Sequence, residues 1–267
     1  MDVNTTNTTA KKRIMALALA LILLLLALTR VTLSYFTDTK KATNTFTYGS
    51  VSVTQWETNA TTDADWTQDG LAYTKFLPIG TTSTNIVDIR AASNYNTKRV
   101  KVQNDANSNP VYVRVFVRVP KELIESSTTP NYQLVHLDFD GGADWGPQTY
   151  YTTTHGQGAN AKQYAVCMYT YVNQLQAGAF TPELLKGVYL DRNADVRKAA
   201  GKATLVYVTD TNGGYYDSGF DVYDGSGTPE SIQVEVATQA VQADAFDNAQ
   251  AAFAAAFGNN DPWGGTF

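Results

Sequence analysis

The stretch VYVRVFVRV, residues 111–119, is the strongest indication of fold in this chain of 267 residues. Every second residue is valine, and Tyr, Arg and Phe fill the positions between. Successive side chains of a β-strand point to opposite faces, so we expect the valines to face the core of a sheet. The turn-forming residues 107–110 come directly before the stretch, and they predict a hairpin with residues 100–103 as its other strand.

The same pattern recurs along the chain in shorter pieces. The composition is rich in Thr, Val, Tyr, Asn and Gly, and only 17% of residues are charged, which favours strands joined by turns. Many short strands of this kind predict a mainly β fold, a jelly-roll-like antiparallel β-sandwich. The further strands are expected at residues 51–53, 164–172, 205–208, 215–223 and 232–236.

Short helical insertions and one longer helix interrupt the predicted strands. Thr181 and Pro182 suit the cap and first turn of a helix over residues 181–185. Phe246 and Phe253 lie on one face of the longest candidate, with Asp244 as its cap. The helices are expected at residues 120–126, 181–185 and 244–257, and the tail at 259–267 is expected to be loose unless Trp263 pins it.

The front of the chain has the layout of a secretory signal. A basic cluster at 11–13 precedes an apolar run at 14–28, and Arg30 interrupts the run before it reaches the roughly twenty residues of a membrane span. Small side chains follow, and they predict cleavage between Ser34 and Tyr35. An uncleaved N-terminal anchor is the alternative. We therefore expect a secreted protein at the cell surface or in the extracellular matrix, which meets a membrane only during export.

The net charge restricts the classes of partner that we expect, and the single cysteine has a predicted place in the core. Residues 1–34 carry four Lys or Arg residues and one Asp, so cleavage would change the net charge from −5 to −8. An acidic chain without a basic stripe argues against nucleic acid as a partner. Cys167 is the only cysteine, and its apolar neighbours predict that it fills the core.

Several segments together resemble the TasA/camelysin family of Gram-positive bacteria. The stretch YFTDTKKATNTFTYGSVSV, residues 35–53, has the family's aromatic pair, its Thr-Asp step and its N-x-F-x-x-G step before a first strand. The similarity extends to residues 69–82, 104–119, 181–191 and 236–253. The chain departs from the family in lacking alanines at the cleavage site, and residues 138–160 have no counterpart.

The resemblance implies a secreted structural protein that assembles with itself into biofilm-matrix or cell-surface fibres. It also implies removal of the signal by a SipW-type peptidase and leaves room for accessory matrix proteins. In this family's mode of assembly, the N-terminal segment completes the sheet of a neighbouring subunit. The corresponding residues are Tyr35, Phe36, Asp38, Asn44, Phe46 and Tyr48.

The segment at 35–49 also suits this role on physical grounds. It has few apolar side chains to bury, so ordering it within one domain contributes little stabilising free energy. An open sheet edge, in contrast, offers the segment a row of backbone hydrogen bonds. The alternative is that the segment is the edge strand of its own domain. The expected organisation is a signal peptide at 1–34, a donor segment at 35–49, a sandwich domain at 50–258 and a tail at 259–267.

Catalytic motifs are absent from the sequence. Camelysin-type relatives have been described as metalloproteases, but the H-E-x-x-H zinc motif is missing, and His136 and His155 are the only histidines. A zinc site that combines both histidines with Asp138 and Asp140 is a minor alternative. We expect no enzymatic activity.

Two binding functions remain open. Asp138, Asp140 and Asp144 lie in the Gly-containing stretch LDFDGGAD, and carboxylates on such a loop are suitable calcium ligands. Apart from such a calcium ion, we expect no cofactor. Trp56, Trp66 and Trp145 suggest a carbohydrate-binding sandwich that stacks sugar rings on exposed aromatics.

Overall fold

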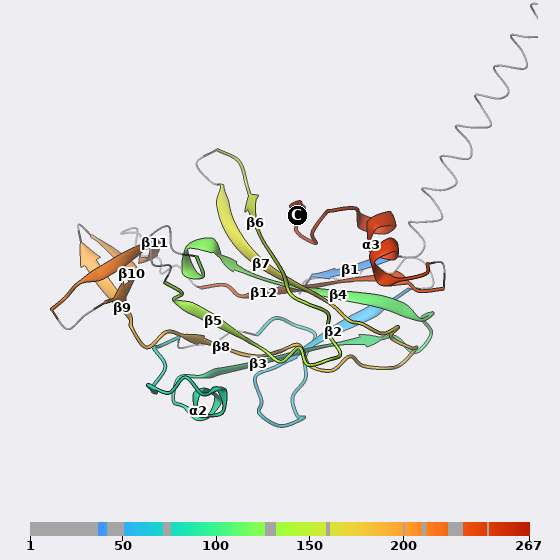
Figure 1. Ribbon diagram of the computed structural model, residues 1–267, viewed down its shortest axis with the longest axis horizontal. Helices are drawn as coiled ribbons and strands as arrows, with labels where there is room; N and C mark the ends of the chain where they lie inside the picture. The colour runs from blue at the N-terminus through green and yellow to red at the C-terminus, as the bar shows by residue number, and fades with distance from the viewer. Residues whose placement is uncertain are drawn as a thin grey trace, which may run out of the picture.

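The molecule is a mainly β structure in which two antiparallel sheets pack face to face (Figure 1). The computed structural model describes residues 51–71, 76–125, 132–158, 161–199, 201–209, 212–223, 232–244 and 246–267, together with the backbone of 37–41. The predicted signal and its cleavage site lie outside these residues. No helix in this part of the chain has the length and apolar character needed to cross a membrane.

The first sheet has five strands in the order β1-β12-β4-β7-β6, and each neighbouring pair is antiparallel. Its central strand β4 is the predicted alternating stretch, and the valines face the core as expected. The strands are β1 (Thr37–Lys41), β12 (Glu235–Gln242), β4 (Val111–Pro120), β7 (Lys162–Thr170) and β6 (Thr149–His155).

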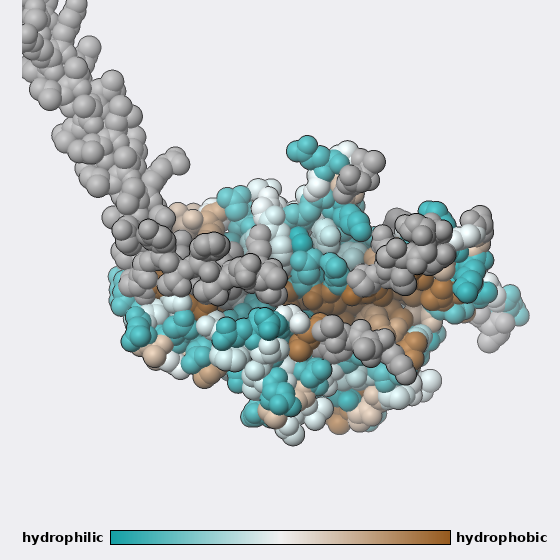
Figure 2. Space-filling model, turned by 180° about the vertical axis from the view of Figure 1, so that it is seen from behind, coloured by the Kyte–Doolittle hydropathy of each residue, from teal (hydrophilic) through white to brown (hydrophobic). Residues whose placement is uncertain are grey.

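The second sheet has four strands in the order β2-β3-β8-β5 and covers the inner face of the first. Alternate residues of β2 and β3, among them Val53, Val100 and Val102, are fully buried against the valines of β4. The strands are β2 (Val53–Thr58), β3 (Asn96–Asn104), β8 (Leu185–Leu190) and β5 (Val135–Phe139). Seen from behind, apolar residues form a band between the two more hydrophilic layers (Figure 2).

A small third sheet, ordered β11-β10-β9, projects from one end of the sandwich (Figure 1). The strands predicted at residues 205–208 and 215–223 are confirmed as β10 and β11, which pair antiparallel in a bulged register. The strands are β9 (Ala194–Ala199), β10 (Lys202–Val208) and β11 (Tyr215–Tyr223).

The predicted hairpin before β4 is wrong. Residues 100–103 belong to β3, which pairs with β2 and β8, whereas β4 pairs with β12 and β7. The turn at 107–110 therefore carries the chain from one sheet to the other. A turn motif predicts that the chain changes direction. It does not predict which sheet the chain enters next.

The helical predictions were partly right. The longest helix in the described part of the chain is α3 (Ala249–Phe257), whose cap is Asn248 rather than Asp244: the Asn248 side chain accepts a hydrogen bond from the Ala251 N–H. Of the helix predicted at 120–126, the described residues 120–125 contain only the 3-10 turn η1 (Lys121–Leu123). The short helix α2 (Ile86–Ala91) was not predicted.

The helix predicted at 181–185 is absent. The Thr181 N–H donates to the Val102 carbonyl and the Leu184 N–H to the Val100 carbonyl, so this segment runs alongside β3. Backbone pairing with β3 outweighs the local preference of a Thr-Pro-Glu sequence for a helix start.

Candidate assembly interface

The candidate site is the edge of the five-stranded sheet, where β12 lies between β4 and β1. Eight consecutive residue pairs join β12 to β4, whereas five join it to β1, from Thr37 opposite Val241 to Lys41 opposite Ala237. The edge strand β1 is therefore attached to β12 through a short ladder. β12 itself is almost completely buried and is held independently of β1.

Only one of the predicted donor residues lies in the described part of the chain. Asp38 is in β1, opposite Ala240. In this single chain β1 occupies the edge of its own sheet, which is the alternative that the sequence left open. The other predicted donor and cleavage residues, Ser34, Tyr35, Phe36, Asn44, Phe46 and Tyr48, lie outside the described residues.

A buried polar network ties the inner face of β12 to β2 of the other sheet. The Thr238 hydroxyl donates to Gln55 Oε1 at 2.9 Å, and Gln55 Nε2 donates to Glu57 Oε1 at 3.0 Å. The chain of contacts ends in an ion pair between Glu57 and Lys98, whose side chains are 3% and 5% exposed. Directional bonds to a second sheet hold β12 in register, whatever pairs with its edge.

On the outer face of the sheet, Arg114 of β4 is buried, and no carboxylate of the described residues forms an ion pair with it. Its Nε donates to the Gln239 side-chain oxygen at 2.6 Å, and its guanidinium lies 4.6 to 5.6 Å from four phenyl rings. The rings belong to Phe116, Phe253, Phe257 and Phe267. Burial lowers the Arg114 pKa to about 10, so the side chain remains a cation at neutral pH. Aromatic faces are suitable partners for such a cation.

The C-terminal tail covers this outer face and Trp263 packs on it, which is the alternative to a loose extension that the sequence left open. Arg118 lies between the rings of Tyr164 and Trp263, 4.3 Å from each centroid. Gly265 packs so closely on β6 that an added Cβ would lie 2.1 Å from Thr153 Oγ1. A pattern in the sequence could have predicted this packing. Two arginines alternate with valines in β4, and the C-terminal tail contains aromatic residues that can cover them.

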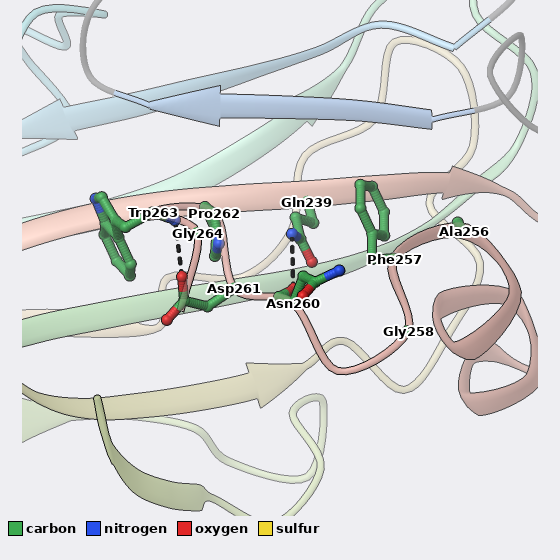
Figure 3. A pocket seen from close by; sticks show the side chains of 9 residues that line it. All are labelled: Gln239, Ala256, Phe257, Gly258, Asn260, Asp261, Pro262, Trp263 and Gly264. Carbon is green, nitrogen blue, oxygen red and sulfur yellow. Dashed lines mark hydrogen bonds between the residues drawn. The ribbon is translucent and has the colours of Figure 1, made fainter. Parts of the chain in front are cut away.

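The tail and the end of α3 border an open surface pocket of about 580 Å³ beside β12 (Figure 3). Gln239 lies on its sheet side and donates to the Asn260 carbonyl at 3.3 Å, while Phe257 and Trp263 lie at opposite ends. Gln239 is the residue that pairs with Thr39 of β1. The C-terminal segment thus borders the same edge that β1 occupies.

The three acidic residues of the predicted calcium loop do not converge in the structure. Arg90 of α2 binds both carboxylate oxygens of Asp138, at 2.6 and 2.9 Å, and the Tyr95 hydroxyl donates to it at 2.6 Å. Asp140 lies 3.5 Å from Lys186. Among the described residues, no group of three His, Cys, Asp or Glu side chains is arranged to hold a metal. Calcium binding therefore has no support from the geometry of Asp138, Asp140 and Asp144.

The two histidines lie on different sheets. His136 of β5 hydrogen-bonds to Asp191 at 3.0 Å and stacks on Tyr189, whereas His155 ends β6 and lies 4.0 Å from Asp261. They do not form the zinc site considered from the sequence. Cys167 is buried as predicted, and burial raises the pKa of its thiol to about 12.

The tryptophans divide between core and surface. Trp145 is 5% exposed and belongs to the main core. Trp66 lies under the Lys101 ammonium, 3.7 Å from its ring centroid, and Trp56 donates from its indole N–H to Gln103. Trp56, Trp66 and Phe180 therefore form a partly exposed aromatic group at β2 and β3.

Comparison with known proteins gives no match: no family model matches the chain, and no curated protein matches it.

Proposed function

We propose that this protein is a secreted structural protein that assembles with itself into extracellular matrix or cell-surface fibres, by exchange of β1 between neighbouring subunits. The observation that carries the proposal is the position of β1: a five-residue edge strand, next to a strand that is fixed without it. The β1 of a neighbour can make the same backbone hydrogen bonds to β12, so exchange conserves them.

The length of the connection favours exchange. Eleven residues separate β1 from β2 in the sequence. At about 3.5 Å per residue they can extend to about 40 Å, which is enough to reach an adjacent subunit of this size. Because each subunit gives its strand to the next, the contact does not close on itself and propagates into a filament. Export by a SipW-type signal peptidase and contact with accessory matrix proteins belong to the same proposal.

A disulfide trap tests whether β1 is exchanged. Lys41 and Ala237 are opposite each other, and antiparallel neighbours lie about 4.5–5.5 Å apart at Cα, within the range a disulfide spans. The variant Lys41→Cys/Ala237→Cys, oxidised under assembly conditions, should give a ladder of covalent oligomers on a non-reducing gel. The Lys41→Cys single variant is the control, because its one added thiol cannot produce a ladder.

Deletion of residues 35–48 provides a second test, read by electron microscopy. We expect a folded protein, checked by circular dichroism, that forms no filaments, and an excess of a peptide of this sequence should cap growing filaments of the intact protein. Filaments from the truncated protein, or an oxidised double-cysteine variant that runs only as monomer while filaments are present, would refute strand exchange.

A second candidate function is glycan binding by the aromatic group at β2 and β3. Phe180 is 45% exposed, and Lys101 lies over both it and Trp66, so flat rings and a cation share one surface. Retention of the protein on an immobilised polysaccharide, lost in Trp56→Ala without loss of filaments, would separate this function from assembly.

A further inference from the structure

The opposite edge of the five-stranded sheet has properties that edge strands of soluble proteins usually avoid. β6 is the last strand of the sheet and pairs with β7 along all seven of its residues. Residues 149–154 make no backbone hydrogen bond to any other described segment. A row of backbone donors and acceptors therefore faces away from β7, as on any open sheet edge.

The other sheet edges in the described part of the chain each carry charge, and most have further protection. β1 contains Asp38 and two lysines, β9 contains Asp195, Arg197 and Lys198, and β11 has two aspartates and a bulged register. β2 has Glu57, which is paired through both its backbone groups to Thr67, and β5 contains Asp138.

β6 has none of these devices. Its sequence is TYYTTTH, without Asp, Glu, Lys, Arg, Pro or Gly. Charge, proline and bulges are the means by which proteins stop one sheet edge from pairing with another. Their absence at this one edge favours pairing with a further strand.

The exposed side chains of β6 complement those of a second β6. Tyr150, Thr152 and Thr154 alternate along one face of the strand, and all three are exposed. In an antiparallel pair centred on Thr152, each Tyr150 would face Thr154 of the other copy, and the two Thr152 side chains would face each other. Tyr–Thr and Thr–Thr neighbours are favourable cross-strand pairs, and no like charges meet.

We propose that β6 is a self-association edge, at which two copies of this chain pair antiparallel about a two-fold axis through Thr152. The two five-stranded sheets then continue as one sheet of ten strands. This contact lies at the opposite edge from β1, so it does not depend on strand exchange. The two contacts are compatible in one assembly, with β1 extending filaments and β6 joining them side by side.

The strength of a single contact follows from its size. A seven-residue edge buries much less than the roughly 1,200–2,000 Å² typical of stable complexes, so an isolated pair should dissociate readily. Along a filament the contact repeats at every subunit, and multivalency turns weak pairs into stable lateral association. Lateral bundling is therefore expected to be far more sensitive to β6 than the dimerisation of free subunits.

Charge substitutions at the centre of the pair test the proposal. Thr152→Lys and Thr152→Glu alter an exposed side chain, so both should fold normally, but each places like charges opposite each other in a homodimer. Each should weaken dimerisation of the unpolymerised fraction at least about tenfold in sedimentation equilibrium, and an equimolar mixture of the two should restore it. Thr61→Lys, at another exposed threonine, is the control with the same charge change.

The same variants should form single filaments where the unchanged protein forms bundles in negative stain. Failure of strand exchange would appear as loss of filaments in every variant, whereas the dimer measurement would still report on β6. Three results would overturn the proposal: an unpolymerised protein that stays monomeric at millimolar concentration, an equal effect of Thr61→Lys, or no recovery in the mixture.

Discussion

Replacing Lys98 by methionine removes one partner of the buried ion pair beneath β12. Glu57 would then keep a single described side-chain donor, the Gln55 amide, while its carboxylate stays 97% shielded from solvent. Removing one partner of a buried pair costs about 3–5 kcal/mol, because the remaining charge is left uncompensated. The Glu57→Gln variant should cost a similar amount, since it leaves the Lys98 ammonium without its counter-charge.

The double variant Lys98→Met/Glu57→Gln should be much more stable than the sum of the two losses predicts. It removes both charges and keeps side chains of similar volume, and such replacements are often close to neutral. A double-mutant cycle should therefore show a coupling of several kcal/mol, well above the roughly 0.5 kcal/mol error of additivity for independent sites.

Urea unfolding followed by circular dichroism measures these differences, with an unchanged m-value as the check on two-state behaviour. Lys186→Met is the matched control, because the Lys186 side chain is 29% exposed beside Glu183 and its loss should cost at most about 1 kcal/mol. A loss below about 1 kcal/mol in Lys98→Met, or strict additivity in the double variant, would show that the network does not hold β12 in place.

Three further outcomes are expected. Trp263→Ala removes the ring that stacks on Arg118 and should cost about 2 kcal/mol in the same assay, with faster proteolysis of the tail. Gly265→Ala places a methyl group against Thr153 and should displace the tail, seen as increased hydrogen exchange at residues 261–267, and unchanged exchange there would contradict the packing. Cys167 should resist iodoacetamide at pH 8 in the folded protein and react after denaturation, as read by mass spectrometry, because burial raises its thiol pKa to about 12. Since the folded thiol holds its proton more tightly than the unfolded one, Cys167 should lower stability as pH rises from about 9 to 12.

The strands were predictable where apolar and other residues alternate along a segment, because the apolar side chains then share one face that packs on the core. The valines of β4 follow that rule. The strands expected at 205–208 and 215–223 were also found, as the paired β10 and β11. Local sequence failed where the outcome depends on distant residues. The Thr181 segment suits a helix start but pairs with β3, which lies about 80 positions earlier in the chain.

The functional residues were less predictable than the fold, because their partners come from far along the sequence. Asp138 fits a calcium loop until Arg90 and Tyr95 are seen to bind its carboxylate. Arg114 alternates with core valines and fits a solvent-facing position, yet four phenyl rings surround it, three of them from the C-terminal segment. Of the predicted donor residues, only Asp38 has a described position, so the role of the segment stays a prediction.

The order of strands in the five-stranded sheet also bears on how the chain reaches its native state. Arg118 of β4 pairs with Glu235, and Thr37 of β1 pairs with Val241, so the two neighbours of β12 lie more than one hundred and more than two hundred positions before it. Such high contact order makes folding slow, because long loops must close before the pairing stabilises anything. The central strand β4 can pair with β7 early, but its other neighbour, β12, is synthesised only near the end of the chain. The five-stranded sheet therefore cannot be completed until late in translation. A chain that folds late can pass through a narrow translocation channel without first being unravelled.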